Sequence, residues 1–180
     1  MTTILLARHG ETDWNLNRRL QGHTDLPLND RGRDQARALA AELANEPIDA
    51  VYSSDLVRAH ETARIVAEGH RLDVTAIDDL RERHFGTWEG LSDDEIYERF
   101  PEAAEGVLGD GETREEMARR VFGALQRIAD THPDGHVLVV SHGGPLRAVL
   151  RHCGVDGVER IDNCHVVRLE AGDGGLREAG

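Results

Sequence analysis

Short apolar runs alternate with amphipathic segments along this sequence, and the alternation restricts the fold more than any other feature. Residues 3–7 (TILLA) and 136–141 (HVLVVS) have the length and apolar character of strands buried on both faces. Similar segments over 49–54 and 72–77 predict two more strands, and the alternating residues 164–170 predict an edge strand. Strands that alternate with helices predict an α/β fold with a mostly parallel, layered sheet.

The segments between these strands predict helices separated by polar loops. The clearest helix spans 117–128, where apolar residues recur every three or four positions. Polar residues predict a loop over 8–28, and glycine-rich acidic residues predict a mobile loop over 102–111. The other helices are expected after a cap at Asn29 or Asp30, after a cap at Ser54 or Asp55, over 93–100 before Pro101, and around Pro145 in a first turn.

Length and composition limit the class of protein. The 180 residues are expected to form one domain over 1–180. The net charge of −13 argues against nucleic-acid binding, which depends on basic surfaces. No apolar run approaches the ~18 residues of a membrane span, and the first residues lack a basic leader. The two cysteines are too few for a disulfide framework and are typical of reduced thiols. We therefore expect a cytoplasmic protein without a membrane partner. A homodimer is compatible with these properties.

Residues suited to holding phosphate follow three of the predicted strands. Arg8 and His9 follow the first strand, Arg58 lies one turn into the helix after the second, and His142 follows the strand at 136–141. A single histidine after a strand is usually a hydrogen-bonded residue without a catalytic role. A single arginine early in a helix is usually a charge exposed to solvent. The carboxyl ends of parallel strands meet at one edge of a sheet, so the four side chains are expected to lie together.

This set of residues fits phosphoryl transfer. The transition state spreads negative charge over three oxygens, so catalysis depends on positioning and fixed positive charge. Arginine can hold two oxygens at once, and Gly143 and Gly144 allow backbone N–H groups to approach a phosphate at a helix start. A neutral imidazole can attack phosphorus, and nearby cations keep it neutral by lowering its pKa.

Five blocks of sequence also carry a resemblance to a known family. They are ARHGETDWN, LQGHTDLPLNDRG, SSDLVRAHETA, LRERHFGTWEG and VVSHGG, in order from Ile4 to Gly144. Together they resemble the histidine phosphatase superfamily, also called the phosphoglycerate mutase-like family. The resemblance implies a three-layer α/β/α sandwich of the phosphoglycerate mutase type. It also implies a metal-independent phosphatase without a cofactor, acting on a small-molecule phosphomonoester.

The same resemblance implies roles for individual residues. His9 corresponds to the phosphorylated nucleophile, and Arg8, Arg58 and His142 correspond to the pocket for the phosphate oxygens. Glu82 corresponds to the proton donor of the family, and an exposed ion pair with Arg81 or Arg83 is the alternative that its neighbours offer. The remaining expected contacts to phosphate or substrate are Asn15, Gln21, Gly22 and Gly143.

The sequence favours a phosphatase over a cofactor-dependent phosphoglycerate mutase. The mutases that this chain resembles have an inserted segment that supplies basic residues for a substrate carboxylate. Here the region from Gly90 to Glu112 is short and acidic, with Arg99 as its only cation, and His23 replaces a tryptophan usual in mutases. The acidic stretch from Glu102 to Glu112 is therefore expected to disfavour strongly anionic substrates.

Two rival classes remain open from the sequence. Ten histidines could serve a metal-dependent hydrolase, but no H-E-x-x-H or H-x-H pair is present, and arginine beside His9 would repel a cation. An inactive phospho-ligand binding or regulatory protein would be indicated by a missing nucleophile or acid. Neither residue is missing, so an enzyme is the preferred interpretation.

Overall fold

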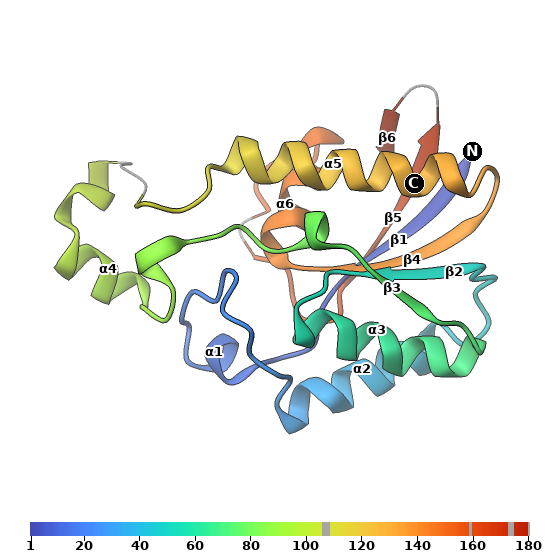
Figure 1. Ribbon diagram of the computed structural model, residues 1–180, viewed down its shortest axis with the longest axis horizontal. Helices are drawn as coiled ribbons and strands as arrows, with labels where there is room; N and C mark the ends of the chain where they lie inside the picture. Colours follow the sequence, from blue (N-terminus) through green and yellow to red (C-terminus); the bar gives the residue numbers. More distant parts are fainter. Residues whose placement is uncertain (106–108, 159, 173–174, 180) are drawn as a thin grey trace.

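The computed structural model describes residues 1–105, 109–158, 160–172 and 175–179, which form a six-stranded sheet with helices on both faces (Figure 1). The sheet order is β3-β2-β4-β1-β5-β6, and the ladders β2–β3, β2–β4 and β1–β4 are parallel. The expected three-layer α/β/α architecture is confirmed. The strands are β1 (Thr2–Arg8), β2 (Ala50–Ser53), β3 (Val74–Ala76), β4 (His136–Ser141), β5 (Val166–Gly172) and β6 (Gly175–Glu178).

The prediction of an edge strand over 164–170 is wrong. β5 lies inside the sheet, because it pairs antiparallel with β1 on one side and with β6 on the other. Its alternating pattern reflects one face against the core and one face toward solvent, which an inner antiparallel strand shares with an edge strand.

The helices lie where the spacing predicts them, with two exceptions. The 8–28 loop contains a short helix, α1, that Thr12 and Asn15 close with a reciprocal capping box. Neither Ser54 nor Asp55 caps α3: its N-cap is Leu56, and Asp55 instead pairs with Arg81. The helices are α1 (Asp13–Leu16), α2 (Asp30–Glu42), α3 (Val57–His70), α4 (Asp93–Arg99), α5 (Arg114–Thr131) and α6 (Gly143–His152), with 3-10 turns at Asp78–Leu80, Gly86–Trp88 and Pro101–Glu105.

Two apolar cores hold the layers together. α5 and α6 pack on one face of the sheet against Ile4, Leu6 and Val139, and α2 and α3 pack on the other face against Leu5 and Val140. Adjacent residues of β1 and β4 therefore enter opposite cores, which explains why both strands are apolar throughout. α1 and α4 lie beyond the carboxyl ends of the parallel strands (Figure 1).

The register of β1 and β4 fixes the position of the two histidines that follow them. Arg8 pairs with Ser141 at the end of the parallel ladder. His9 and His142 each follow directly, so they leave neighbouring strands side by side. The predicted mobile loop over 102–111 begins within a 3-10 turn, and its residues 106–108 lie outside the described part of the chain. None of the described helices has the length and apolar character that crossing a bilayer requires.

Candidate active site

His9 is buried at the end of β1 with one ring nitrogen engaged. The side chain is 2% exposed, and its Nδ1 lies 2.6 Å from the carbonyl oxygen of Gly10. A carbonyl can only accept a hydrogen bond, so Nδ1 carries the proton and donates it. The other nitrogen, Nε2, is left with its lone pair, which is the form a nucleophile requires.

The surroundings of His9 keep the ring neutral. Burial, followed by the positive charges of Arg58 and Arg8, holds the pKa of His9 well below its ordinary value of 6.5. The Gly10 carbonyl opposes this shift but does not outweigh it. At neutral pH the imidazole is therefore uncharged and able to attack an electrophile.

Two buried arginines flank the histidine. Arg58 is 1% exposed, and its guanidinium donates to the carbonyls of Gly22 at 2.7 Å and Thr24 at 2.9 Å. Burial lowers its pKa to about 10, so it is still charged at neutral pH. Arg8 donates one N–H to the Ile161 carbonyl, and its pKa is also lowered by burial. These backbone contacts fix both guanidiniums without neutralising their charge.

His142 completes the cluster at the N-terminus of α6. The side chain is fully buried, and the centre of its ring lies 5.1 Å from that of His9. Burial and then Arg58 hold the pKa of His142 well below its ordinary value. His142 is the N-cap residue and Gly143 begins the helix. In this first turn the Gly144 N–H binds Glu82 and Pro145 has no N–H, so the N–H of Gly143 is the one left to face the cluster within the described residues.

Several nitrogens of this cluster are buried without a hydrogen-bond partner. Within the described residues they are Nε of Arg8, Nε of Arg58 and both ring nitrogens of His142. Buried polar atoms in folded proteins are almost always hydrogen-bonded, because an unpaired one costs the free energy of its lost hydration. Unpaired nitrogens on three cluster residues around one neutral histidine are suited to an oxyanion such as phosphate.

Glu82 approaches the cluster from the loop after the Asp78–Leu80 turn. One carboxylate oxygen accepts from the backbone N–H of Arg83 at 2.8 Å, and the other accepts from Gly144 at 2.9 Å. Glu82 is not in an exposed ion pair with Arg81, which binds Asp55 instead. A Cβ atom on Gly144 would lie 2.0 Å from the carboxylate, so a larger residue at this position would displace the Glu82 side chain.

Arg120 holds the Glu82 loop in place, and no motif in the sequence indicates it. Its guanidinium donates to the carbonyls of Asp79, Arg81 and Glu82 at 2.7–2.9 Å. It also forms a salt bridge with Glu112 at 2.6 Å. Three carbonyls and one carboxylate therefore converge on a single side chain of α5, which fixes the backbone that carries the proposed acid.

The other expected contact residues form the rim and its support. Asn15 accepts a hydrogen bond from the Thr12 backbone N–H through Oδ1 at 3.1 Å, and the buried Gln21 accepts from the Thr12 hydroxyl at 2.8 Å. Gly22 has a φ of +54° and offers its carbonyl to Arg58, so it orients the guanidinium. Gly143 lies in the first turn of α6. The structure thus places Gly22 and Gly143 beside the cluster, Asn15 in α1, and Gln21 in the loop after α1.

Besides Arg120, two further supporting residues were not predicted from the sequence. The Thr62 hydroxyl accepts from the Gly10 N–H at 3.1 Å and donates to the Arg58 carbonyl. Asn163 donates to the His9 carbonyl at 3.0 Å. Thr62 lies one helical turn after Arg58, a spacing that could have indicated it, whereas no local signal marks Asn163. Within the described residues, no group of three His, Cys, Asp or Glu side chains is arranged as a metal site.

The buried histidines predict a loss of stability in mild acid. Folding lowers the pKa of His9 and His142, so the unfolded chain binds protons that the folded protein does not as the pH falls below 6.5. Each histidine then costs up to about 1.4 kcal/mol per pH unit until its folded pKa is reached. Urea unfolding between pH 7.5 and 5.5 should show this fall, with a smaller slope in His142→Asn. An unchanged slope in that variant would contradict the assignment.

Comparisons with known proteins identify the family of this chain. Residues 4–179 match the model of a family described as the histidine phosphatase superfamily (branch 1). Phosphoglycerate mutase-like protein 4 of Arabidopsis thaliana is 42% identical over 94% of this chain and 80% of its own. The metal-independent phosphoserine phosphatase of the same plant is 42% identical over 83% and 67%. The structure of Bacillus stearothermophilus YhfR superposes with a TM-score of 0.92 at 33% identity, covering 99% of this chain and 96% of that one.

Proposed function

The chain belongs to the histidine phosphatase superfamily, and from its site we infer that it hydrolyses a small phosphomonoester through a phosphohistidine at His9. The protein is a metal-independent phosphatase of the phosphoglycerate mutase-like fold, as its relatives indicate. The roles of the individual residues are our proposal. No nucleic acid or membrane is proposed as a partner, and a homodimer stays a prediction.

The unpaired buried nitrogens around His9 carry this proposal. Arg8, Arg58 and His142 each leave at least one buried nitrogen without a partner, and two of these residues are cations. A phosphoryl group bound there would accept hydrogen bonds from the two guanidiniums and from the one ring N–H of neutral His142, and it would offset the positive charge. An inactive binding protein would need the same cationic cluster, but it would not need a neutral histidine after β1 and a carboxylate held near it by Gly144.

The proposed reaction has two steps. Nε2 of His9 attacks phosphorus and the bond from phosphorus to the leaving oxygen breaks, while the Glu82 carboxyl donates its proton to that oxygen. Water then attacks the phosphohistidine, Glu82 accepts the proton of the water, and the P–N bond breaks to release phosphate. Arg8, Arg58 and His142 hold the three oxygens throughout, and the Gly143 N–H at the start of α6 adds a backbone donor.

Transfer to water is favoured over return to a second hydroxyl. Glu82 is half-buried, and it lines a cavity whose other walls include the exposed residues Arg114, Glu115 and Arg151. Water can therefore reach the side of the phosphohistidine where Glu82 would act. A mutase has to exclude water there until the second hydroxyl attacks, so the open cavity supports a phosphatase.

Trapping the intermediate tests the covalent route. Rapid mixing with a ³²P-labelled phosphomonoester, followed by an alkaline quench, should leave up to one phosphoryl group per chain. The label should be lost in acid, because phosphohistidine is acid-labile and base-stable. His9→Asn serves as the matched control and should retain no label. Equal labelling of the wild type and of His9→Asn would place the phosphoryl group elsewhere.

A further inference from the structure

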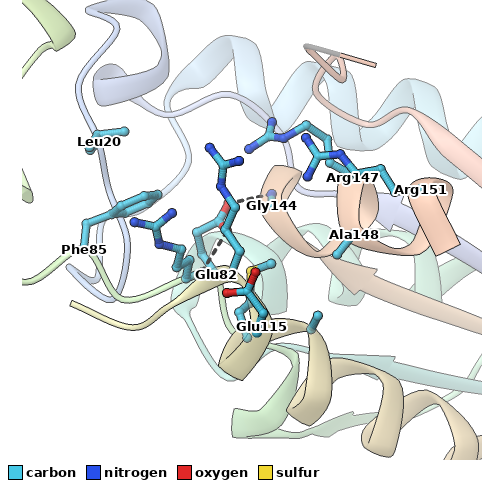
Figure 2. A pocket seen from close by; sticks show the side chains of 12 residues that line it. Leu20, Glu82, Phe85, Glu115, Gly144, Arg147, Ala148 and Arg151 are labelled. Atoms are coloured by element: carbon cyan, nitrogen blue, oxygen red, sulfur yellow. Dashed lines mark hydrogen bonds between the residues drawn. The ribbon is translucent and has the colours of Figure 1, made fainter. Parts of the chain in front are cut away.

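A second cationic cavity adjoins the phosphate site. Its volume is about 460 Å³, and Glu82 and Gly144 of the catalytic cluster form part of its wall (Figure 2). The remaining wall includes four guanidiniums, which we call the arginine pocket: Arg83, Arg114, Arg147 and Arg151. Two carboxylates, Glu82 and Glu115, line the same cavity, so cations outnumber anions there in a protein with a net charge of −13.

The arginines of this pocket are not neutralised by the protein. Within the described residues, none of the four forms a salt bridge, and Glu115 pairs with none of them although it lines the same cavity. Elsewhere arginines such as Arg19, Arg81 and Arg127 bind carboxylates at 2.5–2.6 Å. With so many acidic residues available, four unpaired guanidiniums around one cavity point to an external anion.

Arg83 supplies an independent sign of an absent partner. The residue is 8% exposed, its Nε is buried without a hydrogen-bond partner, and its guanidinium lies 4.9 Å above the centre of the Phe85 ring. Burial and then the charge of Arg114 lower its pKa. A bound anion would satisfy the buried donor and offset that repulsion.

Arg147 and Arg151 lie one turn apart on α6 and line the cavity together (Figure 2). Like charges at this spacing repel each other on a helix. Arg151 in the last turn interacts favourably with the helix dipole, but Arg147 is a turn too early for that benefit. A Cβ atom placed on Gly143 would lie 3.3 Å from Arg147 and 3.6 Å from Arg8. The two arginines therefore lie close enough for one small substrate to contact both the arginine pocket and the phosphate site.

We propose that the arginine pocket binds a second anionic group of the substrate, a carboxylate or a second phosphate, and that Arg147 and Arg151 determine this specificity. The inference rests on the proposed phosphatase function. It opposes the expectation that the acidic stretch up to Glu112 disfavours anionic substrates. The cations come from other parts of the chain, and Glu112 itself is bound by Arg120.

Substrates that differ in one group can test this proposal. 3-Phosphoglycerate and glycerol 3-phosphate differ only by a carboxylate in place of a hydroxymethyl group. Fructose 1,6-bisphosphate and fructose 6-phosphate differ by one phosphate. The wild type should show at least a tenfold higher kcat/KM for the more anionic member of one pair, and the pair that responds identifies the second group. In Arg147→Gln/Arg151→Gln that ratio should fall about tenfold, mainly through KM.

The control variant removes the same charge elsewhere. Arg99 and Arg119 are exposed and do not line the cavity, so Arg99→Gln/Arg119→Gln should keep the wild-type ratio. An equal loss for both members of a pair in the α6 variant would mean that these arginines only steer anions, and would overturn the proposal. Absence of preference in an active wild type would overturn it as well. Failure of the phosphatase function itself would be distinct, since neither member of either pair would then be hydrolysed.

Discussion

His9→Ala will lower kcat by about a thousandfold or more, with the fold intact. The variant removes Nε2, the proposed nucleophile, and leaves Arg8, Arg58 and His142 to bind phosphate without forming a covalent intermediate. Residual activity should come from water attacking a bound phosphomonoester directly. The measurement is steady-state release of phosphate, with circular dichroism and thermal unfolding to verify the fold.

A second histidine provides the matched control for this variant. His136 begins β4, at the opposite end of the strand from His142, and its side chain takes no part in the cluster. His136→Ala should therefore retain activity within about twofold of the wild type. If His9→Ala folds and keeps near-normal turnover, His9 is not the nucleophile and the proposed reaction fails.

Glu82→Gln will slow the hydrolysis of an alkyl phosphate by about a hundredfold or more, since general acid–base catalysis commonly contributes that much. Glutamine keeps the size of the side chain but cannot supply or accept the proton. With p-nitrophenyl phosphate, whose leaving group needs no protonation, the first step should be nearly unaffected. The second step still requires a base, so a burst of p-nitrophenol followed by slow turnover is expected, with labelled phosphoenzyme accumulating.

The dependence on the leaving group separates a proton-transfer role from a structural one. Displacement of the Glu82 loop would slow both substrates equally and would give no burst, and that outcome would contradict the assignment. Glu98 is exposed on α4, so Glu98→Gln is a control for the loss of one carboxylate. It should behave as the wild type with both substrates.

Much of the fold could be predicted because it depends on local patterns. The unbroken apolar character of β1 and β4 indicates strands covered on both faces, and the spacing from Met117 to Ile128 indicates α5. The edge position predicted for β5 is wrong because an alternating pattern indicates which face of a strand is exposed to solvent. It does not indicate whether the strand has a neighbour on both sides. The caps of α3 were misassigned because Asp55 is used by a distant arginine, Arg81.

The candidate site could be predicted only in part, because some of its contacts join residues that are far apart in the sequence. Arg8, His9, Arg58 and His142 could be assigned to one edge, because parallel strands end together and each residue follows its own strand. From its neighbours in the sequence, Glu82 could be either an ionised carboxylate paired with arginine or a proton donor. The Glu82 carboxylate is held by the adjacent Arg83 N–H and by the N–H of Gly144, and the second contact joins segments 62 residues apart.

The sequence by itself determined the order of elements, the edge of the sheet where chemistry can occur, and the residue types that gather there. Only the tertiary structure decided that His9 is neutral, that Arg120 holds the acid loop, and that four distant arginines share one cavity. The physical reason is the distance along the chain over which each kind of interaction acts. Periodicity and strand ends are properties of neighbouring residues, whereas burial and the pairing of charges depend on which distant segments the folded chain brings together.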